Sequence, residues 1–427
     1  MGKEHILVIG TGIIGVACAD ALQRKGFQVT LADDREPGAG CSFGNAGNVS
    51  PGAVVPYSVP GSLSQIPGWL MNPLGPLAIR PNHFLRFLPW GLRWLRSSTT
   101  QRALEVSRAM RLLHTDSLKM YEKLLAPTGH GNLVQTSGQL YVSRVPRKAL
   151  GTELEQFMRE AAGVRTELLD ANAIRDIEPA LSPDYCSGLL FPDNGNCINP
   201  QRLVQTLAEQ VAGNGAAFIR KRVRAFHIID RQVRGVIFED GQTQDFDQIV
   251  IAAGAWSNRL ASQLGAAVPL EAERGYHVTL TDPGVHPRLP VTNKDFSFAS
   301  APMEMGVRLA GTAEYAGLDA KPDWRRAQVL IDHAKNMFPG VRTAEYTRWM
   351  GMRPALPDGL PIIDRPPRFP SVLFAFGNAH FGLTAAPMMG SLIAALATSE
   401  TPAADITAFR ISRFDKSAGA PASQGRQ

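Results

Sequence analysis

The sequence is poor in cysteine. Only four cysteines occur in its 427 residues, namely Cys18, Cys41, Cys186 and Cys197. None of them forms a C-x-x-C pair or a spacing typical of zinc ligands. We therefore expect free thiols, no disulfide and no metal site, as in proteins of a reducing compartment.

The sequence also lacks long apolar runs and blocks of charge. No uninterrupted apolar stretch approaches the roughly 18 residues that a membrane-spanning helix needs. The first strand is expected almost at the N-terminus, which leaves no room for a signal peptide. The net charge of +6 comes from scattered Lys and Arg, which argues against a nucleic-acid-binding protein. These absences predict a cytoplasmic location, with any contact peripheral, on the cytoplasmic face of the inner membrane.

The most informative residues in the sequence are three glycines near the N-terminus. An apolar run from His5 to Ile9 leads into Gly10-Thr11-Gly12-Ile13-Ile14-Gly15, and a second apolar run ends at Asp33. In a dinucleotide-binding βαβ unit, such glycines allow a tight turn, close approach of a pyrophosphate and close helix packing. The carboxylate of Asp33 suits a ribose hydroxyl and disfavours a 2′-phosphate, so NADP is not expected.

Strand and helix patterns return further along the chain. A helical period runs over 101–125, and helices are predicted over 200–214, 324–338 and near 387–399. Strands are predicted over 217–220, 223–229, 232–239, 248–252 and 372–376. The apolar run 249–254 suggests a return to a parallel sheet. This order predicts a nucleotide-binding domain built from separated pieces, with a second domain inserted between them.

A segment rich in Pro, Trp and Leu, residues 51–95, differs from the rest of the chain. At helical spacing, Phe84, Leu88, Leu92 and Leu95 share one side, and Pro89 is expected to divide the helix or to begin its second part. Arginines at 86, 93 and 96 lie opposite. This pattern fits a helix docked on its own core or at a subunit interface, or a basic amphipathic helix on a membrane surface.

Four motifs resemble one family. They are 10–15, Ser42-Phe43-Gly44-Asn45-Ala46-Gly47-Asn48-Val49-Ser50-Pro51-Gly52, Ile251-Ala252-Ala253-Gly254-Ala255-Trp256-Ser257, and Gly351-Met352-Arg353-Pro354-Ala355-Leu356-Pro357-Asp358-Gly359-Leu360-Pro361-Ile362-Ile363. From about His5 to Phe409 the sequence resembles flavoproteins of the D-amino acid oxidase superfamily, and within it the D-amino acid dehydrogenase small-subunit type.

The resemblance implies a fold of class α/β plus α+β, in which a Rossmann-type FAD-binding domain with a parallel sheet carries an inserted antiparallel-sheet substrate domain. The FAD-binding domain is then expected over 1–85, 200–265 and 349–416. The substrate domain is expected over 86–199 and 266–348. A disordered tail is expected over 417–427.

The resemblance also implies FAD as the cofactor and a set of binding residues. These are Gly10, Gly12, Ile13, Ile14, Gly15, Asp33, Asp34, Ser42, Asn45, Ala46, Gly47, Val223, Ala253, Gly254, Trp256, Arg353, Gly382, Leu383 and Thr384. In the segment before the last helix, main-chain amides are expected to face the flavin and to stabilise its anionic reduced form.

The expected catalytic residues are Arg353, His380 and Tyr276. A guanidinium can hold an α-carboxylate through two hydrogen bonds and so direct the Cα hydrogen to the flavin. An imidazole can bind a polar group or accept the amine proton. By resemblance Tyr276 enters the substrate cavity with its neighbour His277, and Phe296 and Phe298 are expected to line that cavity.

The implied reaction is FAD-dependent oxidative deamination of a D-amino acid by hydride transfer to the flavin. Asn378-Ala379-His380 and Asp364 depart from the usual family pattern, and a polar His380 would suit D-proline or cis-4-hydroxy-D-proline. The expected acceptor is a respiratory quinone or another redox partner, and partner subunits are compatible with the pattern. Two alternatives stay open: an oxygen-using glycine or sarcosine-type oxidase, and a non-catalytic FAD-binding subunit of a larger oxidoreductase.

Overall fold

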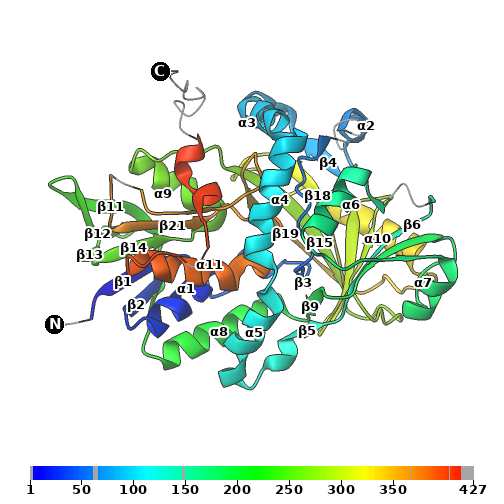
Figure 1. Cartoon of the computed structure of the whole chain (residues 1–427), viewed down its shortest axis with the longest axis horizontal. Helices are drawn as coiled ribbons and strands as arrows, with labels where there is room; N and C mark the ends of the chain where they lie inside the picture. The colour runs from blue at the N-terminus through cyan, green and yellow to red at the C-terminus, as the bar shows by residue number, and fades with distance from the viewer. Residues whose placement is uncertain (1–2, 61–65, 147–149, 367, 403, 415–427) are drawn as a thin grey trace, which may run out of the picture.

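A computed structural model describes residues 3–60, 66–146, 150–366, 368–402 and 404–414. It has two lobes, one built on a parallel sheet and the other on a larger, mostly antiparallel sheet (Figure 1). This is the expected fold class. The tail expected over 417–427 lies outside the described residues.

The parallel sheet has six strands. Their order is β10 (Ala217–Ile219), β2 (Gln28–Ala32), β1 (His5–Ile9), β14 (Gln248–Ile251), β21 (Val372–Phe376) and β20 (Ile362–Asp364). All neighbours are parallel except β20, which runs antiparallel to β21. The central strands are buried on both faces, which explains their continuous apolar runs.

Helices and a small sheet cover the two faces of the parallel sheet. Its helices include α1 (Ile13–Arg24), α8 (Pro200–Gly213), α9 (Ser257–Gln263) and α11 (Gly382–Ala397). One apolar core joins α1, α8 and α11 with α4 (Thr100–His114) and α5 (Ser117–Leu125). The other core joins α9 with the meander of β11 (Val223–Ile229), β12 (Gln232–Phe238) and β13 (Thr243–Asp245).

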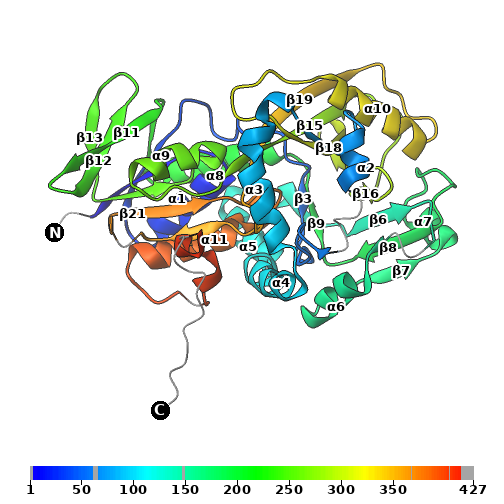
Figure 2. The ribbon, with the colours of Figure 1, turned by 90° about the horizontal axis from the view of Figure 1, so that it is seen from above.

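The second lobe is a nine-stranded sheet. Its order is β19 (Tyr346–Ala355), β15 (Glu271–Leu280), β18 (Gly306–Tyr315), β17 (Phe298–Met303), β16 (Val291–Asn293), β6 (Gln139–Ser143), β8 (Ser187–Phe191) and β7 (Glu167–Leu169), with β4 (Leu77–Ile79) beside β18. Helix α10 (Arg325–Met337) packs on β15 and β18 (Figure 2). The shorter helices α6 (Glu153–Ala161) and α7 (Ala171–Ile177) belong to the same lobe.

A short sheet of β3 (Asn48–Val49), β9 (Gly195–Cys197) and β5 (Val134–Thr136) lies between the lobes (Figure 2). Two elements of the large sheet lie across the expected domain boundaries. Strand β4 falls within 1–85, a stretch expected for the FAD-binding domain. Strand β19 begins at Tyr346 and continues past the boundary expected at 349. A strand belongs to the sheet whose strands form hydrogen bonds with its main chain. Sequence spacing alone does not reveal which strands those are.

Two prolines lie inside helices. Helix α3 (Phe84–Ser97) runs unbroken through Pro89, so the expected division does not occur. Helix α11 begins five residues before Pro387, which was expected at its start. Pro387 has no N–H for the carbonyl of Leu383, and the hydroxyl of Tyr121 donates to that carbonyl instead, at 2.6 Å. Of the helices in the described part of the chain, none is long and apolar enough to cross a membrane.

Candidate active site

Two glycines of the first glycine-rich turn have no room for a side chain. Gly10 has φ +110°, and a Cβ there would lie 2.4 Å from the carbonyl oxygen of Ala252. A Cβ at Gly15 would lie 1.9 Å from the carbonyl oxygen of Gly10. Gly12 caps α1, and its own Cβ would meet nothing closer than 3.5 Å. The turn is therefore a cradle in which a phosphate can approach the backbone at the N-terminus of α1 closely.

The loop over residues 42–47 closes on this turn. The hydroxyl of Ser42 accepts a hydrogen bond from the amide of Ile13 at 3.0 Å. The side chain of Asn45 accepts from the amide of Gly47 at 2.8 Å. From the other lobe, the buried guanidinium of Arg308 donates to the carbonyls of Phe43 and Asn45, at 3.0 and 2.7 Å. These bonds give the loop a fixed conformation.

The acidic residues at the end of β2 have separate partners. Asp33 accepts hydrogen bonds from the amides of Thr11 and Arg35, at 3.0 and 3.1 Å. Asp34 pairs with Arg222, next to Val223 at the start of β11. Arg222 lowers the pKa of the Asp34 carboxyl, although burial alone would raise it. Asp34 is thus ionised, and both side chains lie at the edge where a nucleoside would reach from the glycine turn.

Two further predicted segments lie beside the turn. The guanidinium of Arg35 lies 5.1 Å from the ring of Trp256, in the one-turn helix that also holds Gly254. At the N-terminus of α11, the hydroxyl of Thr384 accepts from the amide of Ser50 at 3.1 Å. The glycine cradle and the N-termini of α1 and α11 supply hydrogen-bond donors suited to the pyrophosphate and flavin of FAD, and the Asp33 side chain supplies an acceptor suited to the ribose.

The second part of the site lies on one face of β15 and β19. Alternate residues of β15 pair in register with those of β19, so Glu273 lies opposite Arg353, Gly275 opposite Gly351, and His277 opposite Trp349. Because side chains alternate across a strand, all six positions face the same side. A Cβ at Gly275 would lie 2.1 Å from a guanidinium nitrogen of Arg353. The arginine therefore lies flat over this glycine.

Glu273 joins three side chains. Its Oε1 accepts from Arg353 Nη1 at 2.6 Å and lies 2.8 Å from His380 Nε2. Its Oε2 accepts from the hydroxyl of Tyr315 at 3.2 Å. Burial alone would raise the pKa of this carboxyl, but His380 and Arg353 hold it well below its usual range. Glu273 is therefore a buried, ionised carboxylate at the centre of a cluster with Arg353, His380 and Tyr315, here called the Glu273 cluster.

His380 comes to the cluster through the segment before α11. The amide of Ala379 donates to the carbonyl of Pro354 at 2.9 Å, and Asn378 forms a bridge with Ala355. This pairing aligns the segment with the end of β19, two residues beyond Arg353. The ring of Tyr57 lies 4.5 Å from that of His380 and adds an aromatic wall.

An aromatic stack adjoins the cluster. The ring of His277 lies 5.1 Å from Trp349 and 6.1 Å from Phe43. Burial and the nearby Arg308 lower the pKa of His277 to about 3. The ring is therefore neutral, and its Nδ1–H donates to the carbonyl of Gly44 at 3.1 Å. His277 thus links the loop over 42–47 to the large sheet.

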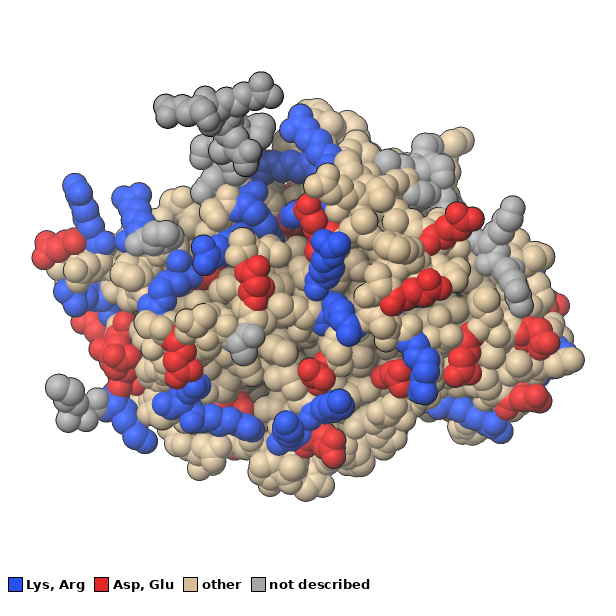
Figure 3. Space-filling view, in the orientation of Figure 1, with Lys and Arg blue, Asp and Glu red and all other residues tan. Residues whose placement is uncertain are grey.

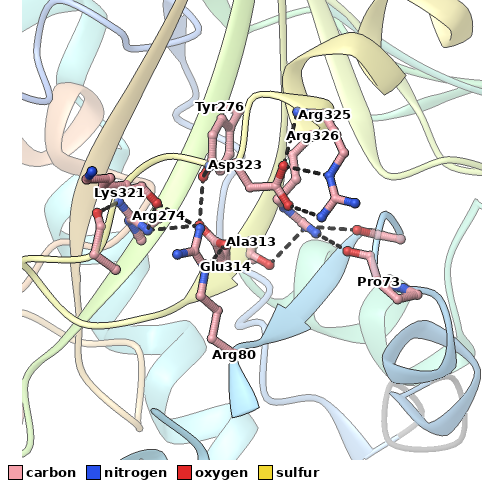
Figure 4. A network of polar contacts seen from close by, with 12 residues as sticks. Pro73, Arg80, Arg274, Tyr276, Ala313, Glu314, Lys321, Asp323, Arg325 and Arg326 are labelled. Carbon is pink, nitrogen blue, oxygen red and sulfur yellow. Dashed lines mark hydrogen bonds and ion pairs between the residues drawn. The ribbon is translucent and has the colours of Figure 1, made fainter. Parts of the chain in front are cut away.

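Tyr276 does not join Arg353 and His380. It alternates with His277 and points to the opposite face of the sheet, where its hydroxyl donates to Glu314 at 2.7 Å and accepts from the amide of Asp323 at 2.9 Å (Figure 4). Burial raises the pKa of Tyr276 to about 12. Tyr276 therefore belongs to a buried polar network. Phe296 and Phe298, which were expected to line the substrate cavity, stack on His333 of α10 instead.

The comparisons with known proteins agree with this geometry. A family model described as FAD dependent oxidoreductase, for the DAO family, matches residues 5–396. The chain belongs to this family. FAD is therefore its cofactor, as the resemblance implied, and the chain is an FAD-dependent oxidoreductase of the D-amino acid oxidase family.

Individual relatives cover nearly the whole chain. A D-amino-acid oxidase of Bradyrhizobium diazoefficiens is 35% identical over 418 residues, which are 96% of this chain and 99% of the relative. Glycine oxidase from Geobacillus kaustophilus has a similar fold, with a TM-score of 0.71, 19% identity and coverage of 96% and 99%. L-proline dehydrogenase from P. horikoshii also has a similar fold, with a TM-score of 0.70 and 19% identity, over 96% of this chain and 98% of that protein. At such identities the two structures show the fold alone.

Sequence reasoning missed Glu273, Tyr315 and Tyr57. Glu273 and Arg353 are 80 residues apart, and they meet because β15 and β19 are neighbours in one sheet. The sequence offers one weak signal, a carboxylate at the start of a long strand pattern, where a charged inward-facing residue needs a partner.

Proposed function

We propose that this protein oxidises a D-amino acid to the imino acid, which hydrolyses to a 2-oxo acid and ammonia or remains a cyclic imine if the substrate is a proline. The observation that carries the proposal is the meeting of Arg353 and His380 on Glu273, next to the loop over 42–47. The 35% identical relative is named a D-amino-acid oxidase, which supports the substrate class. The neighbour named L-proline dehydrogenase makes a cyclic substrate worth testing.

In this proposal, Arg353 binds the substrate carboxylate through donors other than the Nη1 that Glu273 holds. His380 binds or deprotonates the substrate amine, because hydride loss requires a neutral amine. FAD, when bound, would supply the two-electron acceptor for the hydride that Cα loses. Arg353 and His380 thus do their part by orienting the substrate, and the same geometry disfavours a non-catalytic FAD-binding subunit.

The first test is anaerobic. D- and L-amino acids, including D-proline and cis-4-hydroxy-D-proline, are added to the purified protein while its flavin absorbance is recorded. We expect bleaching by D-forms only. Bleaching by sarcosine or glycine in their place, with peroxide formed in air, would favour the oxygen-using alternative.

We further propose that electrons pass to a quinone and that the protein contacts the membrane peripherally. Seven large apolar side chains of α2 (Ile66–Met71) and α3 are exposed, namely Leu70, Met71, Phe84, Leu85, Leu88, Leu92 and Leu95. The opposite side of α3 carries Trp90, which is buried and donates to the carbonyl of Ala355 at 3.2 Å. Both sequence interpretations of this helix therefore find support: its aromatic side docks, and its leucine side faces outward.

The sequence segment that holds this surface carries charge of one sign. Residues 37–104 contain no Asp or Glu and five Arg. Arg86 and Arg96 of α3 are exposed. Basic side chains lie at the top of the molecule, over α3 (Figure 3). An apolar ridge with a basic border is the pattern expected for contact with an anionic membrane surface.

We predict that the protein sediments with vesicles of phosphatidylglycerol and not with phosphatidylcholine alone. Replacing Leu85, Leu88 and Leu92 together by Gln should weaken vesicle binding by at least about tenfold, because each buried leucine contributes about 1.5 kcal/mol. The matched control is a double replacement of Ile228 and Ile229, which are exposed on β11. Equal binding by both variants would remove α3 from the contact.

A further inference from the structure

We propose that Glu273 is a positioning residue for the oxidation, which fixes the orientation of Arg353 and the tautomer of His380 at once. The inference rests on the proposed function and assigns a role to a residue that the predicted site did not contain. Its basis is the shared acceptor: one oxygen, Oε1, lies 2.6 Å from Arg353 Nη1 and 2.8 Å from His380 Nε2.

The position of Arg353 follows from three contacts. Nη1 donates to Glu273 and, at 3.3 Å, to the carbonyl of Thr312. The guanidinium lies over Gly275, where a Cβ would overlap it. An arginine loses considerable side-chain entropy when it is fixed, and here that loss occurs during folding and not on substrate binding. The remaining donors of the guanidinium are thereby prepared for a carboxylate.

The tautomer of His380 follows from the chemistry of its partner. An ionised carboxylate only accepts hydrogen bonds, so the Nε2 that faces it must carry a hydrogen. In the neutral ring the lone pair is then on Nδ1. A proton that leaves the substrate ammonium moves to Nδ1, giving a neutral amine and an imidazolium, and the adjacent Glu273 carboxylate stabilises that imidazolium.

The groups that face Glu273 and His380 come from several elements packed around them. Arg353 lies on β19, Tyr315 on β18, His380 before α11, and Tyr57 against His380. Tyr315 also anchors the cluster to the aromatic side of α3, since its ring lies 4.6 Å from Phe87. Replacing the carboxylate by an amide therefore removes the charge while leaving the aromatic surround in place.

The test compares Glu273→Gln with Glu178→Gln, both as FAD-loaded enzymes. Glu178 is a fully buried carboxylate whose partners are the amides of Arg288 and Ala180, outside the Glu273 cluster. Two quantities are measured: the dissociation constant of tetrahydrofuran-2-carboxylate, from its perturbation of the flavin spectrum, and the anaerobic rate of flavin reduction by D-proline across pH. Thermal melting of both variants checks that they fold.

We expect Glu273→Gln to weaken carboxylate binding about tenfold and to lower the reduction rate about a hundredfold near neutral pH, since a small misplacement of positioned groups costs that much. The rate defect should shrink at alkaline pH, where the free substrate is already a neutral amine. Glu178→Gln should change neither quantity.

Unchanged carboxylate binding together with a rate defect that is the same at every pH would overturn the inference. So would equal behaviour of the two variants. If D-amino acids bleach the wild-type enzyme but Glu273→Gln behaves like it, the inference fails and the proposed function stands. If no amino acid bleaches the wild-type enzyme, the proposed function fails, and carboxylate binding alone decides whether Glu273 positions Arg353.

Discussion

Replacing Arg353 by Ala should raise KM for the D-amino acid by about a hundredfold or more while FAD remains bound, because removing one partner of a buried, hydrogen-bonded charge pair costs about 2–5 kcal/mol. In the proposed function, Arg353, which lies over Gly275, is the binding group for the substrate carboxylate. Steady-state kinetics and the ratio of flavin to protein absorbance measure the two effects separately.

Arg353→Ala also leaves the buried Glu273 without the guanidinium that donates to it at 2.6 Å, which by itself lowers stability. Arg353→Lys is the matched variant, because it keeps the positive charge and loses the planar, two-pronged geometry. We expect the lysine variant to melt close to the wild-type temperature and still to show a KM raised at least about tenfold. A lysine variant with wild-type KM would mean that Arg353 does not bind the carboxylate.

Gly15→Ala is the second change with a large expected effect. Its Cβ would lie 1.9 Å from the carbonyl oxygen of Gly10, so α1 must move away from β1. Such overpacking costs about 3 kcal/mol of unfolding free energy. Because the same movement withdraws the helix N-terminus from the pyrophosphate, the purified variant should contain little FAD.

Thermal melting with and without added FAD checks this expectation. The control is Gly213→Ala at the end of α8, where an added Cβ would have no neighbour within 4 Å. That variant should retain FAD and melt at or slightly above the wild-type temperature, because alanine favours helix over glycine. A Gly15→Ala enzyme that purifies with a full complement of FAD would show that the turn tolerates a side chain.

Local patterns in the sequence predicted much of the nucleotide-binding half. The turn from Gly10 to Gly15 combines strand, glycine and helix signals within a few residues, and β11 was predicted with the bounds that the structure gives it. Such features depend on chain neighbours alone. Arg353 and His380 were predicted from a family resemblance, and the structure brings both to one carboxylate.

The rest of the site depends on sheet geometry that the sequence does not carry. Tyr276 and His277 are neighbours in one strand, so only one of them can face Arg353, and a predicted strand does not say which. Glu273 became recognisable only when β15 and β19 were placed side by side. Likewise, the helical period of α3 revealed two faces, but not that aromatic side chains cover the inner one and leucines the outer one.

The order of strands in the parallel sheet has a consequence for biosynthesis. Strand β21 lies inside the sheet beside β14, although it is translated late, from Val372 onward. Helix α11 is translated after it and packs closely on α1, where Gly390 lies against Ala17. Until those last segments leave the ribosome, the nascent chain carries an open strand edge and an uncovered helix. Because the N-terminus of α11 belongs to the candidate FAD site, we expect the cofactor to bind only after α11 has packed on α1, and we expect a chain that stops short of α11 to be prone to misfolding.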